Sequence, residues 1–190
     1  RLQFIALDPA GNQFAGGSAL SEYFSVYLGA PYSMFFQSLI GLATGGSPFS
    51  PNPVVGVGDR GGNLISTINS GTVTASTFTA PSPEFKVLPQ SNLRVEFING
   101  VATFQGLYID QEGSGYSLKF STSLALTGSQ FLYTNAFGVQ IGEAALLTFD
   151  RTISSGSVVA GEFMTSPPRL TLRDAGGNHI IRDNSNGLQV

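Results

Sequence analysis

Two short motifs carry the side chains best suited to bind a metal ion. Asp59-Arg-Gly-Gly-Asn63 and Asp174-Ala-Gly-Gly-Asn178 each place an Asp four residues before an Asn, around two glycines. Calcium takes about six to eight oxygen ligands, and each motif offers only two side chains, so a calcium site would need further oxygens at a domain junction. The alternative is a tight turn in which Asp and Asn bond the local backbone. The sequence leaves both hypotheses open.

Side chains that could perform catalysis are scarce. His179 is the one histidine and the chain has no cysteine, so no zinc cluster and no Ser-His-Asp arrangement is indicated. The carboxylates lie mostly beside turns, which argues against a paired-acid glycosidase site. The nine Lys and Arg residues are scattered along the chain, which argues against a nucleic-acid interface. We therefore expect a protein that is not an enzyme and has no cofactor.

The stretch that must organise the fold lies between residues 94 and 120. Asn99-Gly100 separates two short alternating segments, which predicts a two-residue type I′ hairpin turn, because that turn needs positive φ at both positions. Farther along, Tyr116, Leu118 and Phe120 alternate with polar residues, which places these three on one face of a strand. The region therefore predicts three antiparallel strands of a β-sandwich.

Composition also favours an all-β protein. Charged residues make up only 11% of the chain, while glycine (24) and phenylalanine (15) are abundant, as is typical of β folds rich in turns. An apolar share of 42% argues against disorder, and no apolar run approaches the length of a membrane helix. Loops are expected at 41–53 and 79–90. Strands are expected near 24–28, 32–37, 53–59, 72–78, 94–98, 101–108, 116–124 and 130–135.

Internal repetition divides the chain into domains. Four segments recur in the same order, each about 115 positions later: 24–30 at 137–144, 53–63 at 168–178, 2–4 at 118–120, and 11–14 at 128–131. Residues 1–22 are therefore predicted to be the last strands of one repeat, 23–136 a complete repeat, and 137–190 the first half of the next. The connections between repeats are short, which predicts a semi-rigid rod.

The pattern of residues 53–63 followed by 99–120 resembles the bacterial-type immunoglobulin-like repeats of very large surface proteins. Such repeats occur in adhesins and in giant extracellular proteins of algae and protists, including flagellar-hair (mastigoneme-type) proteins. The resemblance implies tandem immunoglobulin-like β-sandwiches, an extracellular or cell-surface location, and a structural role in adhesion or assembly as a rod, spacer or filament subunit. It implies as partners other copies of the chain, other extracellular structural proteins, and glycans. Neither nucleic acid nor membrane insertion of this segment is expected.

The immunoglobulin-like reading assigns structural roles to particular residues. Tyr116 is expected to form a tyrosine corner, with its phenol bonded to backbone around Asp110–Gly113. Leu118 stands where an antibody domain has a cysteine, and tryptophan is absent, so the core is expected to be aliphatic and Phe-based. The expected core residues are Phe97, Phe104, Leu107, Tyr116, Leu118 and Phe120.

Two further hypotheses concern carbohydrate. Alternating Ser and Pro favour extended, exposed segments, which in an algal or plant-like extracellular protein are candidate sites for O-glycans; the alternative is a rigid loop. The candidate residues are Ser47, Pro48, Ser50, Pro51, Pro53, Ser82 and Pro83. The alternative function is a carbohydrate-binding β-sandwich module, which would need a flat cluster of exposed rings drawn from Tyr27, Tyr32, Tyr108 and Tyr133, whereas a spacer needs none.

Overall fold

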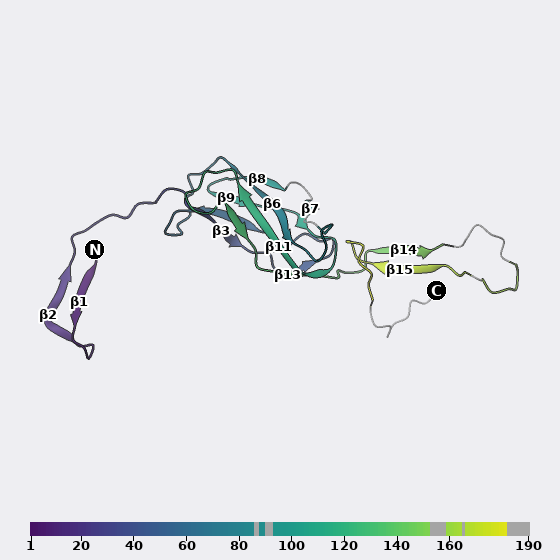
Figure 1. The fold of residues 1–190 in the computed structure, drawn as a ribbon, viewed down its shortest axis with the longest axis horizontal. Helices are drawn as coiled ribbons and strands as arrows, with labels where there is room; N and C mark the ends of the chain where they lie inside the picture. The colour runs from purple at the N-terminus through teal and green to yellow at the C-terminus, as the bar shows by residue number, and fades with distance from the viewer. Residues whose placement is uncertain (86–87, 90–92, 153–158, 165, 182–190) are drawn as a thin grey trace.

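The computed structural model describes residues 1–85, 88–89, 93–152, 159–164 and 166–181, and every regular element within these ranges is a β-strand. The predicted all-β class is therefore confirmed. An N-terminal hairpin, a central sandwich and a C-terminal hairpin follow one another along the chain (Figure 1). The described residues contain no helix that is long and apolar enough to span a membrane.

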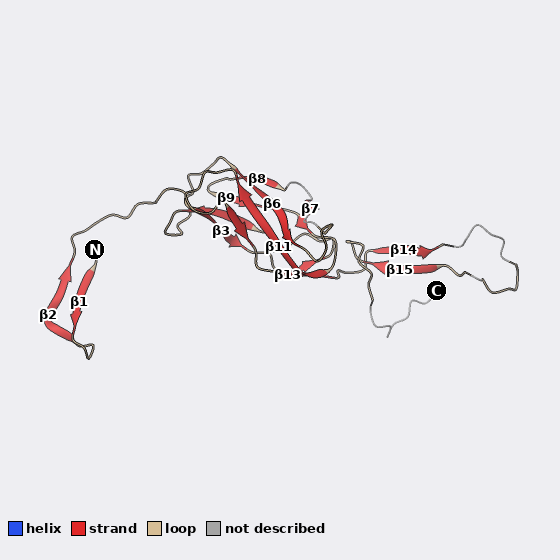
Figure 2. Ribbon diagram, in the orientation of Figure 1, coloured by secondary structure: helices blue, strands red, loops and turns tan. Residues whose placement is uncertain are grey.

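The central sandwich is built from two main sheets (Figure 2). The larger sheet has the order β4-β13-β11-β6-β8, with β12 also paired to β11, and the smaller sheet has the order β3-β5-β9. A separate two-stranded sheet joins β7 to β10. The strands are β3 (Ser33–Ser38), β4 (Ala43–Thr44), β5 (Val54–Gly58), β6 (Thr72–Thr79), β7 (Leu88–Pro89), β8 (Arg94–Glu96), β9 (Val101–Thr103), β10 (Leu107–Tyr108), β11 (Gly113–Thr122), β12 (Phe131–Tyr133) and β13 (Phe137–Gln140).

The tight turn expected at Asn99-Gly100 is present, with φ values of 51° and 75°. Ile98 and Val101 exchange two backbone hydrogen bonds of 2.9 and 3.0 Å across it. The flanking strands then separate, because β8 pairs with β6 in the larger sheet and β9 pairs with β5 in the smaller one. The turn therefore carries the chain from one layer of the sandwich to the other.

The core lies between the two sheets, and its largest fully buried side chains are aromatic rings. All six expected core residues are at most 1% exposed. The ring of Phe120 meets those of Phe104 and Phe36 edge to face, with centroids 5.1 and 5.5 Å apart. Full burial of each such side chain contributes roughly 1.5–3 kcal/mol, so this cluster accounts for much of the cohesion of the sandwich.

The strand expected at Phe24–Leu28 is wrong, because that segment has no strand structure and Tyr27 is 85% exposed. Its counterpart in the repeat, Phe137–Gln140, is β13, which pairs with the first half of β11 and, in parallel, with β4. The larger sheet thus continues across the boundary expected after residue 136. Residues 24–28 form no strand pairing with β1 (Gln3–Leu7), the first strand of the N-terminal hairpin.

Smaller differences concern strand ends. The strand expected at 101–108 is divided into β9 and β10 by a turn at Gln105-Gly106, where Gly106 has φ of 70°. The loops expected at 41–53 and 79–90 contain the short strands β4 and β7. Residues 86–87 and 90 of the second loop lie outside the described residues. Two-residue strands carry too little periodicity to be predicted locally.

The C-terminal hairpin reproduces the pairing of β3 with β5. It consists of β14 (Leu146–Arg151) and β15 (Arg169–Arg173). The strand pairs β14–β15 and β3–β5 are both antiparallel. In each, the pairing register shifts between the last two residue pairs. The repeat places Leu147 and Phe149 at the positions of Met34 and Phe36. The matching pairs are Leu147↔Leu172 with Met34↔Val57, and Phe149↔Leu170 with Phe36↔Val55.

The N-terminal hairpin, β1 with β2 (Gln13–Leu20), reproduces the pairing of β11 with β12 in the same way. Gln3↔Leu20, Phe4↔Ala19 and Ile5↔Ser18 correspond to Lys119↔Tyr133, Phe120↔Leu132 and Ser121↔Phe131. A side-chain latch recurs as well: the Leu118 amide donates to the Thr134 hydroxyl at 2.9 Å, and the Leu2 amide donates to the Ser21 hydroxyl at 2.8 Å. This register aligns Phe131 with Ser18, so the expected match of Phe131 with Phe14 is wrong.

Candidate functional site

The turn Asp174–Asn178 is held together around the Asp174 carboxylate. The Asn178 amide N–H donates to Oδ1 at 2.8 Å, and its side-chain Nδ2 donates to both carboxylate oxygens at 3.1 and 2.9 Å. Gly142, just after β13, donates its N–H to Oδ2 at 2.8 Å. These bonds connect the turn to the end of the central sandwich, and N–H donors satisfy both carboxylate oxygens.

The same turn contacts the central sandwich through the loop Asp110–Glu112. Asn178 Nδ2 donates to the Asp110 carbonyl at 2.6 Å, and the Glu112 N–H donates to Asn178 Oδ1 at 2.9 Å. Gln111 Nε2 adds a long contact of 3.5 Å to the Gly176 carbonyl. We call this contact between the loop and the turn the joint. Asn178 is the centre of the joint because its amide both donates to and accepts from the loop.

Glycines allow the two sides of the joint to approach each other. Gly45 and Gly46 lie after β4, and a Cβ on either would overlap with atoms of the Asp174–Asn178 turn. A Cβ on Gly176 would overlap with the Asp110 carbonyl. Gly46 also has φ of 71°, which side chains rarely adopt. Larger residues at these positions would separate the turn from the loop.

Tyr116 holds the loop side of the joint in place. Its hydroxyl donates to the Gln111 carbonyl at 2.9 Å, within the range expected for a tyrosine corner. The ring is fully buried and stacks against Phe137 of β13, with centroids 6.0 Å apart. Burial raises the pKa of the phenol, which keeps the donating proton in place. Tyr116 therefore connects the core, the last strand of the sandwich and the joint.

Two carboxylates at the joint have pKa values shifted in opposite directions. Burial raises the pKa of Asp174, but the hydrogen bonds from Asn178 and Gly142 outweigh it and leave the pKa below its ordinary value. Burial raises the pKa of Asp110, and the negative charge of Asp174 raises it further. The joint therefore holds Asp174 ionised and opposes ionisation of Asp110.

The turn Asp59–Asn63 has the same internal construction at the other end of the sandwich. Asp59 accepts from the N–H groups of Asn63 and Gly29 at 2.9 and 3.0 Å, and from Asn63 Nδ2 at 3.1 Å on both oxygens. The Gly29 bond, followed by those from Asn63, lowers the pKa of Asp59 to about 2. Unlike Asn178, which is 5% exposed, Asn63 is an exposed residue.

These hydrogen bonds bear on the calcium hypothesis. Each Asp carboxylate accepts from N–H donors of its own turn, as the local-turn alternative requires, and from the N–H of an upstream glycine. In the part of the chain that is described, no three His, Cys, Asp or Glu side chains group in a way that could hold a metal ion. His179 is exposed, and its backbone forms a bridge with Arg173. The geometry favours a structural turn over calcium.

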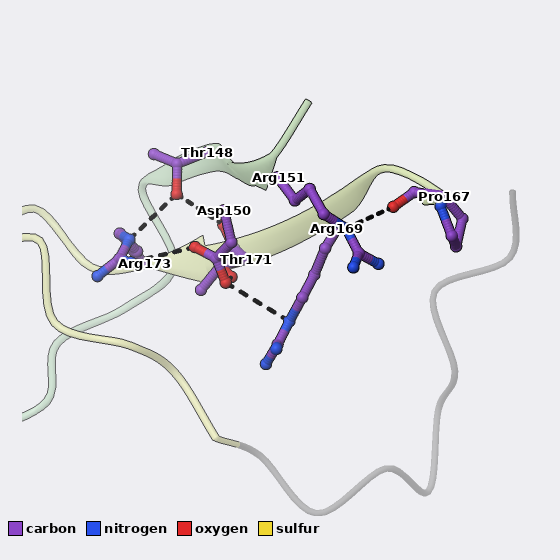
Figure 3. Close-up of polar contacts among 7 residues, drawn as sticks. All are labelled: Thr148, Asp150, Arg151, Pro167, Arg169, Thr171 and Arg173. Carbon is purple, nitrogen blue, oxygen red and sulfur yellow. Dashed lines mark hydrogen bonds and ion pairs between the residues drawn. The ribbon is translucent and has the colours of Figure 1, made fainter. Parts of the chain in front are cut away.

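A polar network on the C-terminal hairpin was not expected from the sequence. Asp150 accepts from the Thr171 hydroxyl and lies 3.4 and 3.6 Å from Arg173 and Arg169 (Figure 3). Arg173 also donates to the Thr148 hydroxyl at 3.0 Å and to the Gly177 carbonyl at 2.8 Å. The hairpin is therefore connected to the joint turn through Arg173. Alternation of polar residues in 148–150 and 169–173 was the only local signal for this network.

The candidate glycan residues differ in accessibility. Pro53 is fully buried, and its carbonyl accepts from the Phe104 N–H at 3.0 Å, so the prediction of a modified residue there is wrong. Phe49 is 2% exposed and anchors the loop to the core, so the loop is not extended throughout. The other candidates remain accessible: Pro48, Ser50, Pro51 and Pro83 are exposed, and Ser47 and Ser82 are half-buried.

The tyrosines expected to bind sugar are dispersed. Tyr27 lies on the segment before the sandwich, the Arg60 guanidinium covers the Tyr32 ring at 5.7 Å, and Tyr108 is half-buried. Tyr133 meets Phe78 at an interplanar angle of 61°, so these two rings form no flat platform. The described tyrosines thus do not assemble the surface that a carbohydrate module needs.

Comparisons with known proteins do not assign this chain to a family. A scan against protein-family models, a search of curated proteins and a search of solved structures each found no match to this chain.

Proposed function

We propose that this chain belongs to a tandem array of immunoglobulin-like β-sandwiches of about 115 residues, in which it acts as a non-catalytic spacer, rod or filament segment. The observation that carries the proposal is the recurrence of register. The hairpin before the central sandwich reproduces three residue pairs of β11 with β12 and the side-chain latch. The hairpin after it reproduces the pairing of β3 with β5 and its irregularity. Unrelated hairpins would have no reason to share such details.

The joint supports a mechanical role. Asn178 makes two hydrogen bonds to the loop Asp110–Glu112, each worth about 0.5–1.5 kcal/mol. The close glycine contacts at Gly45, Gly46 and Gly176 define one fit between the two sides. Such a contact is strong enough to favour one orientation of successive units and weak enough to open under load. This behaviour suits a semi-rigid rod.

The surface location and the partners follow from the resemblance to surface-protein repeats. In this proposal the array lies outside the cell, and its partners are neighbouring copies or other extracellular structural proteins. The intact mass of the native protein tests this setting, because glycan increments are expected if the exposed Ser-Pro residues are modified. An unmodified mass would remove the glycoprotein part of the proposal.

Insertion of extra repeats tests the rod. Gly29 and Gly142 are equivalent, since each donates its N–H to the Asp of the turn that follows. Inserting residues 30–142 once or twice directly after Gly142 therefore lengthens the array in register. Small-angle X-ray scattering should show the longest dimension growing by a nearly constant amount per insertion, with an unchanged cross-section.

A chain of equal length carrying Gly/Ser inserts is the control, because flexible segments extend only with roughly the square root of their length. If the repeat insertions behaved like the Gly/Ser inserts, or if the inserted copies failed to fold, the rod proposal would be wrong.

A further inference from the structure

We propose that the Asp59–Asn63 turn is a docking surface for the loop end of another sandwich unit, one that presents counterparts of Gly45-Gly46 and of Asp110–Glu112. The inference rests on the proposed tandem array and identifies the contact by which the central sandwich would receive the unit before it. The occupant is thus defined by its chemistry: two small residues beside a loop that offers one backbone carbonyl and one backbone N–H.

The first argument is that the two turns have the same construction. In both, the Asn backbone N–H donates to Oδ1 of the Asp, at 2.9 Å in Asp59–Asn63 and 2.8 Å in Asp174–Asn178. In both, Asn Nδ2 contacts both carboxylate oxygens, and an upstream glycine donates to Oδ2. The two turns therefore present the same Asp-Asn framework to whatever docks on them.

The second argument is that only one of the two surfaces is covered. Asn178 is 5% exposed because the loop Asp110–Glu112 lies against it. Asn63 is exposed, as are Gly61 and Gly62. Among the described residues, the Asn63 side chain forms hydrogen bonds through Nδ2, and these go to the two carboxylate oxygens of Asp59. Its Oδ1 is therefore available for the N–H that Glu112 supplies at the occupied joint.

The third argument concerns charge. Position 60 is Arg, whereas its counterpart in the occupied joint is Ala175. The Arg60 guanidinium lies over the Tyr32 ring, 5.7 Å from its centroid. A loop with the acidic character of Asp110-Gln111-Glu112 would meet a positive charge there. Opposite charges across a contact favour the correct partner and orientation.

The experiment uses the full chain with residues 30–142 inserted once after Gly142. In this chain the Asp59–Asn63 turn of the second copy follows a complete sandwich. Hydrogen exchange of the Glu112 N–H in the first copy reports docking, and Ser114→Thr in that copy separates its peptides by mass. Protection of this amide is expected, and Asn63→Ala in the second copy should accelerate its exchange by on the order of tenfold or more.

The matched control is the same Asn63→Ala substitution in the first copy. The turn of that copy follows no complete sandwich, so this substitution should leave exchange at Glu112 of the first copy unchanged. Protection of β11 amides in both copies shows whether the inserted unit folds. If the inserted unit is unfolded, the tandem-array proposal fails. If both copies are folded but Glu112 of the first copy exchanges freely, or responds equally to both substitutions, the docking proposal alone is overturned.

Discussion

Substitution of Asn178 by alanine should open the joint, and Asn63→Ala provides an internal control. Both asparagines make the same bonds within their own turns. Only Asn178 adds bonds to the central sandwich, 2.6 Å to the Asp110 carbonyl and 2.9 Å from the Glu112 N–H. The difference between the two variants therefore isolates the contribution of the joint from that of the turn.

The expected magnitude follows from the two bonds. At about 0.5–1.5 kcal/mol each, Asn178→Ala should lower the free energy of opening at Glu112 by about 1–3 kcal/mol. That change corresponds to roughly 5- to 150-fold faster exchange of the Glu112 amide. Asn63→Ala should leave this amide unchanged, because its turn lies at the other end of the sandwich.

The assay is amide hydrogen exchange of the 190-residue chain at neutral pH, with β11 amides as a reference for global stability. If exchange at Glu112 were unaffected by Asn178→Ala, or were accelerated equally by both substitutions, the joint would not be the stabilising contact described above.

Three further outcomes are expected. Tyr116→Phe should lower the unfolding free energy by about 1–2 kcal/mol, because it removes a buried bond, whereas Tyr133→Phe, at a ring that is 43% exposed, should change it by less than about 0.5 kcal/mol in urea titrations. The pKa of Asp59 is lowered to about 2, so its stabilising contribution is complete above the ordinary pKa and is lost as the pH falls from about 4 through 2. The melting temperature of the unsubstituted chain should fall over this pH range, and Asp59→Asn should lack that fall. Asp110→Asn should raise the melting temperature at neutral pH, because the raised pKa of Asp110, from burial and the charge of Asp174, shows that its ionised form is disfavoured in the fold; a lower melting temperature would refute this.

Local patterns predicted those features that depend on short-range geometry. The Asn99-Gly100 turn follows from backbone sterics, since few other residue pairs adopt two successive positive φ values. Alternation placed Tyr116, Leu118 and Phe120 on the buried face of β11 because side chains of a strand point to opposite sides. The tyrosine corner could also be predicted from the sequence, because the hydrogen bond from Tyr116 spans only five residues.

Pairing between distant segments could not be predicted in this way. The segments at 24–28 and 137–140 have similar sequences, yet only the second forms a strand, β13, which pairs with the first half of β11. Likewise, nothing local shows that β8 and β9, joined by a tight turn, enter different sheets. A strand needs a partner edge, and the position of that edge is a property of the whole fold.

The two Asp-x-Gly-Gly-Asn motifs show the same division. The sequence by itself determined that each is a turn, since the spacing of Asp, Gly and Asn satisfies the backbone within five residues. Only the tertiary structure decided that Asn178 is buried in a joint while Asn63 faces solvent. The physical reason is that burial depends on which surface lies opposite, and a turn motif carries no information about the loop that covers it.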